Sequence, residues 1–462
     1  MAMVEEKHEV FTERRGEIRL PVGIRFKYKL SGASGVSDSV HTAVTKNVSA
    51  AGLLFESEEQ IPVDAELGLV LTMFGVPPLL FAVEGKVAAL ERLSASTFNI
   101  GVNFIKISDA DRAEFKRRIE RVNIVNLLGR SNKKGISDLH LTANLPPMIR
   151  AQGTIKPLDN EPLSAEEIKQ MIYSILSDDQ KLRVQEEKDL DLTFAPSADS
   201  RYRISVYHQR GNIEAVFRHI MPNIKSTEEL GLPDVVKDIC ELKDGLVIIG
   251  GTTGSGKTTT IATMIDIISR KRNGVVLSLE KPIEHIHVNT KGVVKQREVG
   301  VDIASFASGL TAALRQDPDV IVVGEVLDFD TIKATLQAVE TGHLVITSLH
   351  ATDTVQVFDR LISFFPLDQR NFIYARLSHS LKAIIIQSLL PHKDGTGRVV
   401  ATEVCTVTPA VRRMIYTGEF TQLPSIMQTS SQYKMHLMQY SIDELLARNL
   451  ISAETAETYS KK

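Results

Sequence analysis

The residues of this chain that are best suited to chemistry form a glycine-rich segment, 246–260, which reads LVIIGGTTGSGKTTT. After four apolar residues comes the pattern G-x-x-x-x-G-K-[ST], which starts at Gly251 and closes with Gly256, Lys257 and Thr258. In such a P-loop, glycines let backbone N–H groups wrap a phosphate, the lysine reaches the β- and γ-phosphates, and the threonine hydroxyl binds Mg²⁺. The helix that follows presents its positive N-terminus to the anion. The segment therefore predicts a site for a nucleoside triphosphate with Mg²⁺.

Two acidic segments are candidates for the rest of this site. The apolar run 320–323 predicts a buried strand that delivers Glu325 at its end, where parallel sheets place their chemistry, and a carboxylate there can hold Mg²⁺ directly or through water. A second strand, 275–279, leads into Glu280 and Glu284. One of these carboxylates can orient or deprotonate the attacking water. The alternative is that Glu280 and Glu284 are surface charges beside a proline turn.

Two histidines, His343 and His350, flank a third expected strand at 344–348. They lack further Cys or His at metal spacing, so we expect them to sense the γ-phosphate at the sheet edge rather than bind a metal. Without a P-loop nearby, they would be structural. The loop residues expected to contact the nucleotide are Gly251, Thr252, Thr253, Gly254, Ser255, Gly256, Lys257, Thr258 and Thr259.

Length and composition set the context for this site. The chain has 462 residues, which favours about three domains, and a net charge of −3, which does not call for nucleic acid or an anionic membrane. It has only Cys240 and Cys405 and shows no secretory signal, so we expect a reduced, cytoplasmic setting. The apolar cluster 381–390 is shorter than the ~18 residues of a membrane span, so any membrane association is expected to be peripheral.

Three segments with different patterns follow one another along the chain. Residues 1 to about 125 look β-rich and end in a basic helix over 112–122, with Ser108 as its N-cap and 116–118 as its solvated face. The next hundred residues mix strands and helices, and include a capping box at 164–167 that opens a helix to Leu176. From about residue 233, strand-length apolar runs alternate with helical patterns. This alternation predicts a parallel sheet with helices on both faces.

From about residue 123 to 460 the chain resembles the PilT-type ATPases, the retraction motors of type IV pili within the secretion ATPase superfamily. The resemblance includes a signature at 410–415 that marks PilT rather than assembly ATPases, and the chain lacks the four-cysteine insertion usual in the latter. The other motifs, in family order, are 137–140, 145–150, an Asp box at 280–284, a Walker B at 324–325, and a His box at 340–343 and 349–350.

The resemblance implies an α+β PAS-like lobe at 123–230, then an α/β RecA-like lobe with C-terminal helices at 231–462. It also implies a hexameric ring with ATP and Mg²⁺ between the lobes. The family roles carry over to Lys257 and Thr258 on phosphate and Mg²⁺, to Glu325 in Walker B, and to Glu284 as catalytic base. Arg203 and Arg218 occupy the family's arginine positions, where a guanidinium can meet developing γ-phosphate charge. Their alternative role is ordinary salt bridging.

Two residues depart from the family pattern. Lys281 stands where the Asp box normally has an acid, and Leu327 replaces the arginine that normally follows Walker B. An ammonium near the nucleotide could lower the pKa of Glu284 and weaken it as a base, or it could pair with Glu280. Loss of the arginine removes a bidentate partner. We expect ATP binding to survive and turnover to be slow.

The β-rich segment 1–122 resembles the PilZ domain, a small six-stranded barrel that binds cyclic di-GMP. An Arg-x-x-x-Arg pair, Arg15 and Arg19, is preceded by Arg14, and the motif Asn-x-Ser-x-x-Gly follows as Asn47, Ser49 and Gly52. Guanidiniums can clamp phosphates and stack on guanine, while the Asn and Ser side chains hydrogen-bond a base edge or a phosphate. The alternative is a PilZ-like barrel used only for protein contacts.

The sequence as a whole predicts a cytoplasmic, hexameric ATPase of pilus retraction and twitching motility that cyclic di-GMP regulates. It would dock on the inner-membrane platform protein of the pilus, at the cytoplasmic face of that membrane. The alternative is a regulatory paralogue that binds ATP, hydrolyses it weakly or not at all, and joins another ATPase's ring. A nucleic-acid motor is disfavoured by the balanced charge and the lack of a clear basic groove.

Overall fold

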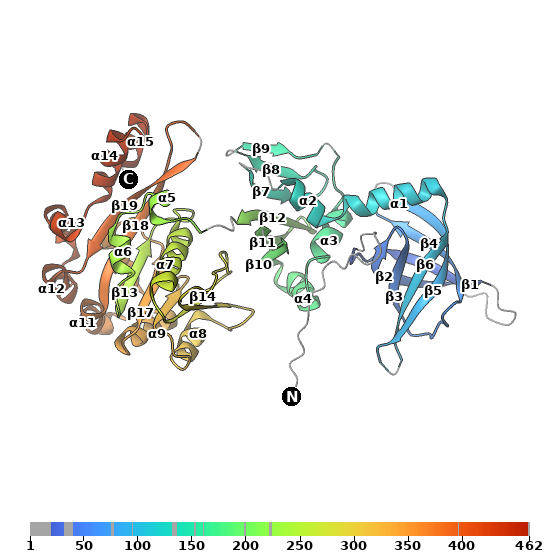
Figure 1. Ribbon diagram of the computed structural model, residues 1–462, viewed down its shortest axis with the longest axis horizontal. Helices are drawn as coiled ribbons and strands as arrows, with labels where there is room; N and C mark the ends of the chain where they lie inside the picture. The colour runs from blue at the N-terminus through green and yellow to red at the C-terminus, as the bar shows by residue number, and fades with distance from the viewer. Residues whose placement is uncertain are drawn as a thin grey trace. The chain divides into compact units, whose positions relative to one another are not determined.

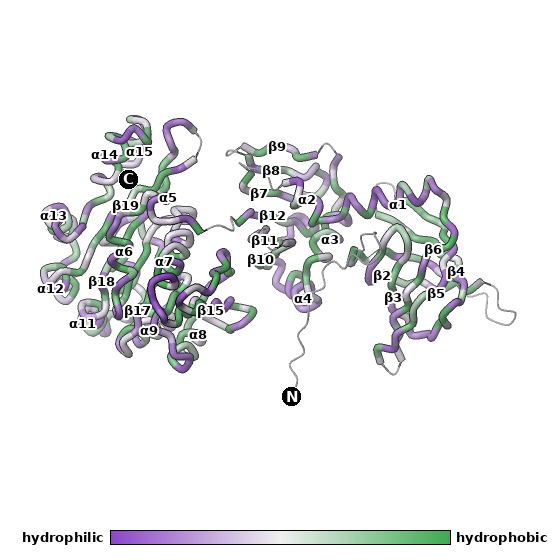
Figure 2. The backbone as a smooth tube through the Cα atoms, in the orientation of Figure 1, coloured by the Kyte–Doolittle hydropathy of each residue, from purple (hydrophilic) through white to green (hydrophobic). Residues whose placement is uncertain are grey.

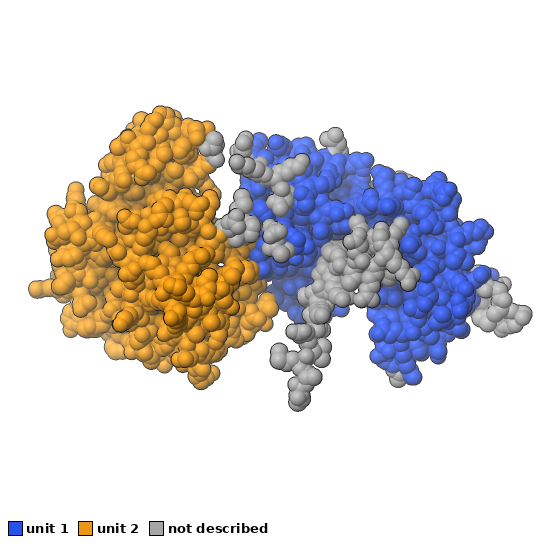
Figure 3. All heavy atoms as spheres, viewed as in Figure 1, with its two compact units in different colours: residues 1–219 blue, residues 220–462 orange. Residues whose placement is uncertain are grey.

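The chain forms two compact units in the computed structural model, residues 1–219 (unit 1) and 220–462 (unit 2), shown in blue and orange in Figure 3. Each unit is described by itself. The residues that the structure describes are 20–31, 40–74, 78–94, 96–131, 136–151, 154–159, 161–197, 200–220, 224–395 and 397–460.

Unit 1 begins with an antiparallel barrel whose strands follow the order β1-β2-β3-β6-β5-β4 (Figure 1). The pairing of β1 with β4 closes the barrel. Its strands alternate apolar and polar residues, so one face of each strand fills the interior. Phe55 packs there against Phe26 and Tyr28, with ring centroids 5.0 and 5.3 Å away. The predicted six-stranded barrel is thus confirmed. Its strands are β1 (Arg25–Ser31), β2 (His41–Ser49), β3 (Gly52–Ser57), β4 (Glu66–Met73), β5 (Leu79–Arg92) and β6 (Phe98–Lys106).

Helix α1 (Asp109–Arg121) follows the barrel, and Ser108 caps it as predicted by accepting a hydrogen bond from the Asp111 backbone. Phe115, buried on the inner face of α1, contacts the rings of Phe81 and Phe104 from the barrel. The prediction of a solvated 116–118 run was wrong for Arg118. Only 17% of its side chain is exposed, and it donates to the Phe74 carbonyl and to Glu114.

A second antiparallel sheet, in the order β10-β11-β12-β7-β8-β9, occupies the rest of unit 1. Its apolar residues join those of the barrel in one continuous hydrophobic core. That the sheet is PAS-like stays a prediction, as do the boundaries at 123 and 230. Its elements are α2 (Ile124–Ser131), β7 (Ile136–Leu141), β8 (Met148–Ala151), β9 (Thr154–Pro157), α3 (Ala165–Tyr173), α4 (Asp178–Glu187), β10 (Asp189–Ser197), β11 (Ser200–Gln209) and β12 (Asn212–Ile220).

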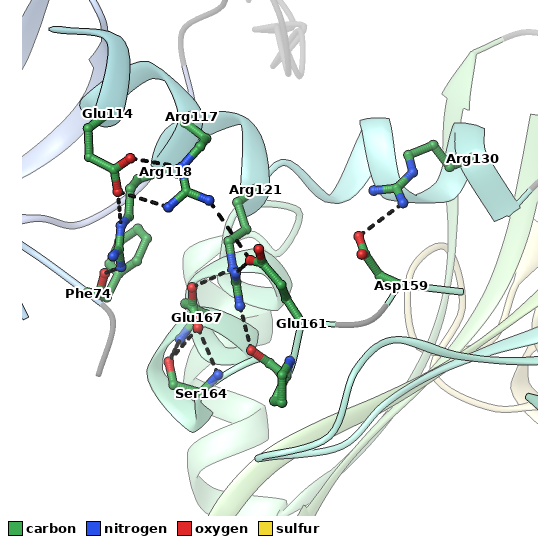
Figure 4. A network of polar contacts seen from close by, with 11 residues as sticks. Phe74, Glu114, Arg117, Arg118, Arg121, Arg130, Asp159, Glu161, Ser164 and Glu167 are labelled. Carbon is green, nitrogen blue, oxygen red and sulfur yellow. Dashed lines mark hydrogen bonds and ion pairs between the residues drawn. The ribbon is translucent and has the colours of Figure 1, made fainter. Parts of the chain in front are cut away.

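Polar contacts reinforce this shared core at the start of α3 (Figure 4). Ser164 and Glu167 form the predicted capping box, although the helix ends at Tyr173 rather than Leu176. Arg121, the last residue of α1, pairs with Glu167 and Glu161. Gly23, which precedes β1, donates its backbone N–H to the side chain of Gln170 on α3 at 3.1 Å. Both ends of the barrel segment are therefore bound to the same helix.

Unit 2 is built on a seven-stranded sheet in the order β15-β14-β16-β17-β13-β18-β19, which is parallel except for β19. Separate apolar cores cover its two faces, as the predicted α/β architecture requires. Its strands are β13 (Gly245–Gly250), β14 (Val275–Glu280), β15 (Val293–Glu298), β16 (Val320–Val323), β17 (Leu344–Leu349), β18 (Leu381–Pro391) and β19 (Arg398–Thr406).

The helices of unit 2 place its apolar surface against the sheet, and Figure 2 shows hydrophobic residues along the central strands. Within the described ranges, no helix is long and apolar enough to cross a membrane. The helices are α5 (Thr227–Leu230), α6 (Val235–Ile239), α7 (Lys257–Lys271), α8 (Phe306–Ala313), α9 (Phe329–Glu340), α10 (Thr354–Ser363), α11 (Arg370–Ser380), α12 (Pro409–Thr417), α13 (Leu423–Thr429), α14 (Met438–Ala447) and α15 (Ala453–Ser460).

Candidate nucleotide and dinucleotide sites

The glycine-rich segment lies between the buried strand β13 and helix α7, as a phosphate loop requires. Gly254 and Gly256 have φ values of +78° and +93°, in the left-handed region that favours glycine. Gly251 is closely packed as well, because an added Cβ would lie 2.3 Å from Ser255 Oγ and 2.6 Å from the carbonyl oxygen of Gln387. The backbone path of the loop therefore depends on these three glycines.

Lys257 begins α7 and turns back across the loop. Its Nζ donates to the carbonyl oxygens of Gly251 and Thr252, both at 2.9 Å. Burial lowers the pKa of this lysine, and the nearby carboxylate of Glu325 offsets part of that effect. An anion bound in the loop would further favour the ammonium form, since an opposite charge stabilises it.

Three charged or titratable groups converge where β13, β16 and β17 end. Glu325 follows β16 and lies beside Lys257, while His350 follows β17 with its Nε2 3.6 Å from Glu325 Oε2. Ser348 fixes the turn after β16 by donating to the Gly324 carbonyl at 2.6 Å. Burial and the charge of Lys257 lower the pKa of His350, so this imidazole is neutral at pH 7 and able to donate one hydrogen bond.

The residues here fit a magnesium-bound triphosphate. Thr258 presents an exposed hydroxyl in the first turn of α7, and the Glu325 side chain is 30% exposed at the neighbouring strand end. Ser255 Oγ is buried in the loop and has no hydrogen-bond partner among the described residues. Oxygen groups of this kind are the ligands that Mg²⁺ prefers, together with phosphate and water.

His343 does not join this site within its own chain. It precedes β17, and the parallel register pairs the start of that strand with Gly245, whereas the P-loop follows Gly250 at the other end. Its Nδ1 lies 2.9 Å from the Ala338 carbonyl oxygen and 3.0 Å from Thr341 Oγ1. Six strand residues at about 3.3 Å each separate the two sheet edges. His343 therefore lies too far from the P-loop of its own chain for the expected contact with the γ-phosphate.

The Asp box begins at the last residue of β14, and its first acid, Glu280, is not the surface charge that the alternative proposed. Glu280 Oε1 accepts hydrogen bonds from Ser278 Oγ at 2.8 Å and Gln296 Nε2 at 2.9 Å. Burial raises the pKa of Glu280, and the charges of Glu284 and Glu298 raise it further. Lys281, which stands where the family has an acid, is exposed, so its charge is solvated. The hydrogen-bond donors to Glu280 are the uncharged side chains of Ser278 and Gln296.

Arg203 and Arg218 lie on β11 and β12 of unit 1, and both pair with aspartates in their own sheet. Arg218 Nε donates to Asp138 Oδ1 at 2.8 Å, and Arg203 lies 3.7 Å from Asp191 Oδ2. Burial raises the pKa of Asp138, but hydrogen bonds from Ser137 and Arg218 outweigh it and leave the pKa lowered. Their action on a nucleotide stays a prediction.

The second predicted ligand site is in the barrel. Arg14, Arg15 and Arg19 lie outside the described residues, but Leu20, which follows Arg19, pairs with Val48 through two hydrogen bonds of 2.9 and 3.0 Å. Val48 stands between Asn47 and Ser49 in the second motif. Asn47 Oδ1 is buried and has no hydrogen-bond partner within the described ranges. This orphaned acceptor fits a ligand that donates a hydrogen bond.

The other two residues of that motif have structural tasks. Ser49 Oγ accepts the Ala51 N–H at 3.2 Å in the β2–β3 turn. An added Cβ on Gly52 would lie 2.2 Å from the Val102 carbonyl oxygen on β6. Gly52 therefore permits close strand packing, which is a different role from the ligand contact expected of it.

Sequence reasoning missed two glutamines, one beside the P-loop and one beside the Asp box. Gln387 on β18 donates to Thr260 Oγ1 at 2.8 Å and places its carbonyl against Gly251. Gln296 on β15 binds Glu280. Neither residue belongs to a motif, and each lies on a strand distant in sequence from its partner. A burial pattern could mark these strands, but it does not reveal which glutamine faces the site.

Comparison with known proteins gives the family. Residues 215–439 match the family described as type II/IV secretion system protein, and residues 13–121 match the PilZ domain. The chain is 39% identical to the type IV pilus retractation ATPase PilT of Pseudomonas aeruginosa over 340 residues, which is 74% of this chain and 98% of that protein. It is 37% identical to the type IV pilus ATPase PilU of the same organism over 324 residues, 70% and 89% of the two chains.

A solved structure agrees. The crystal structure of the pilus retraction motor PilT with bound ADP is 38% identical, covers 72% of this chain and 96% of its own, and superposes with a TM-score of 0.67. The RecA-like ATPase fold and the N-terminal barrel predicted from the sequence are therefore both confirmed. The chain belongs to the PilT-type family of secretion ATPases and carries a PilZ domain at its N-terminal end.

Proposed function

We propose that this protein is an ATP-hydrolysing motor of pilus retraction that cyclic di-GMP regulates. The observation that carries the catalytic part is the convergence of Lys257, Glu325 and His350 at the ends of three neighbouring strands. It acts as a homo-hexamer at the cytoplasmic face of the inner membrane, on the platform protein of a type IV pilus. The names of its relatives, type IV pilus ATPases, support this assignment.

In the proposed hydrolysis, different residues of the site bind the phosphates, bind the metal and accept the proton of the attacking water. The P-loop amides and Lys257 bind the β- and γ-phosphates, and Thr258 and, through water, Glu325 would hold Mg²⁺. When bound, the metal would neutralise part of the phosphate charge. Neutral His350 donates a hydrogen bond to the γ-phosphate, and Glu284 accepts a proton from the attacking water.

Arg203 and Arg218 complete this scheme from the N-terminal lobe. In this proposal the two guanidiniums leave their aspartates and meet the developing γ-phosphate charge. Arginine fingers of this kind increase the rate by about 10³–10⁵. Arg218 is 65% exposed in the side chain, and the buried Asp138 keeps the Ser137 hydroxyl and Arg150 as partners when Arg218 leaves it.

Cyclic di-GMP acts through the contacts of the barrel with α3. The ligand is held by Arg14, Arg15 and Arg19 together with Asn47 and Ser49. The pairing of Leu20, the residue after Arg19, with Val48, which stands between Asn47 and Ser49, supports this proposal. Three residues after Leu20, the Gly23 amide reaches α3. We expect a ligand bound beside Val48 to change, through Gly23, how α3 and its sheet are held.

The alternative function is a regulatory subunit that binds ATP but does not turn it over, and Lys281 and Leu327 motivate it. Leu327 is 54% exposed and adds no charge where the family has an arginine. Steady-state phosphate release by the wild type and by Glu284→Ala separates the two. A wild-type rate well above that of the variant supports the motor, and equal background rates support the regulator.

The regulatory proposal is tested on the full chain with point variants. Removing residues 1–122 would expose the core that the barrel shares with the second sheet. Cyclic di-GMP binding and ATPase rate are therefore measured in parallel on the wild type and on the point variant Asn47→Ala, which retains residues 1–122. Equal rates and equal ATP affinity with and without saturating dinucleotide would contradict regulation.

A further inference from the structure

Gln296 lies at the centre of a hydrogen-bond set around the Asp box. From the half-buried fourth position of β15, its Nε2 donates to Glu280 Oε1 at 2.9 Å and to the His285 carbonyl oxygen at 2.7 Å. Its Oε1 accepts the His287 backbone N–H at 3.0 Å. Both the amide NH₂ and the amide oxygen of Gln296 are thus hydrogen-bonded to the segment that contains Glu284.

The segment 281–292 joins β14 to β15 without helix or strand of its own. Backbone groups in such a segment lack ladder partners, so side chains must fix its path. Glu298, two residues after Gln296 and on the same face of β15, accepts the Ile283 N–H at 3.0 Å. The strand therefore holds the loop on both sides of Glu284, at Ile283 and at His285.

We infer that Gln296 is a positioning residue for ATP hydrolysis, which holds Glu284 at the distance its reaction with water requires. The inference rests on the proposed role of Glu284 as the base. Gln296 acts through the backbone of His285 and the carboxylate of Glu280. A shift of about 1 Å in a reacting group can cost 10²-fold in rate, so loss of these contacts lowers turnover.

The competing account is that Gln296 only stabilises the loop. The two roles differ in what a substitution changes. A structural role lowers melting temperature and ATP affinity together with rate. A positioning role lowers kcat while leaving KM for ATP nearly unchanged, because the phosphates are bound by the P-loop on other strands.

The first test compares Gln296→Met with Lys295→Met in the full-length hexamer. Methionine keeps the length and volume of glutamine but makes none of its three hydrogen bonds. Lys295 is the exposed neighbour on the opposite face of β15. We expect Gln296→Met to lower kcat by about 10- to 100-fold, with KM for ATP within about threefold of wild type. The melting temperature should fall by only about 2–4 °C. The Lys295 variant should match the wild type.

The second variant, Gln296→Glu, supplies a readout that a structural role would not move. A carboxylate at this position cannot donate to His285 and repels Glu280, whereas its protonated form regains one donor. Its kcat relative to wild type should therefore rise as pH falls from 8 to 6. The same ratio for Gln296→Met should not change with pH.

Glu284→Gln is measured beside these variants to separate the inference from the function on which it rests. Turnover retained by Glu284→Gln would show that the proposed base is wrong. Turnover lost by Glu284→Gln but retained by Gln296→Met would overturn the positioning role alone. A parallel loss of ATP affinity and melting temperature in both Gln296 variants, with no recovery of Gln296→Glu at low pH, would also overturn it.

Discussion

The Nε atom of Arg121 lies 3.0 Å from Oε1 of Glu167, so the last residue of α1 is bound to the carboxylate that caps α3 (Figure 4). The Glu167 side chain is 4% exposed. A buried carboxylate is stable only when it is paired and hydrogen-bonded. This one pair therefore joins the helix that ends the PilZ domain to the lobe that follows it.

We predict that Arg121→Gln destabilises unit 1 and weakens the response to cyclic di-GMP. Removing one partner of a buried pair costs about 3–5 kcal/mol, and the capping bonds from Ser164 reduce this to roughly 2 kcal/mol. Urea denaturation, followed by a probe in the barrel, measures it. Arg117→Gln is the control, because Arg117 is exposed and surface pairs are worth about 0–1 kcal/mol. Equal effects of the two variants would contradict the role of the Arg121–Glu167 pair.

Gly52→Ala should destabilise the barrel, since the new methyl group would lie 2.2 Å from the Val102 carbonyl oxygen. Overpacking of this kind costs typically about 1–3 kcal/mol. Gly129→Ala in α2 is the matched control, because among the described residues nothing outside the adjoining helix backbone lies within 4 Å of its added Cβ. Alanine also favours helix by roughly 1 kcal/mol. Thermal melting should fall for the first variant and hold or rise for the second. The reverse order would show that Gly52 is not set by packing.

The histidines predicted together should behave differently. His350→Ala should lower kcat by about 10- to 100-fold, because the neutral imidazole lies beside Glu325 and Lys257 at the triphosphate site. His343→Ala should change neither kcat nor ATP affinity within one subunit's site, since it lies at the other sheet edge. Steady-state ATPase assays measure both. A loss of ATP affinity in His343→Ala would place that histidine at a nucleotide of a neighbouring subunit.

The raised pKa of Glu280 predicts a pH-dependent cost to stability. When the folded pKa lies above the unfolded value, the group stabilises the fold below the unfolded pKa, and this contribution is lost as pH rises through the folded pKa. Glu280→Gln should therefore melt at a higher temperature than wild type at pH 7.5. The difference should shrink as pH falls toward about 4.5. A difference independent of pH would mean that burial does not disfavour the carboxylate.

Much of this architecture could be predicted from local patterns. The P-loop, the strand runs at 275–279 and 320–323 and the Ser108 and Ser164 caps depend on residues close in sequence, and the structure contains each of them. The closed barrel and the parallel sheet followed from alternation and from the resemblance to known families.

Other features depend on contacts between residues distant in sequence, which no local pattern specifies. From the sequence, Arg118 is expected to be a solvated charge on a basic helix. In the structure it donates to the carbonyl of Phe74, which follows β4. His343 and His350 look like a pair, although one strand separates them. Gln296 carries no motif, and only the parallel pairing of β14 with β15 brings it to Glu280.

Phosphate release by the wild-type protein, measured with and without saturating cyclic di-GMP, tests the central claim most directly. We predict a wild-type rate well above that of Glu284→Ala and a change of about fivefold or more on adding the dinucleotide, as typical coupling energies give. The change should be absent in Asn47→Ala. Wild-type release at the level of Glu284→Ala, whatever the dinucleotide does, would contradict the account and leave an ATP-binding regulatory subunit in its place.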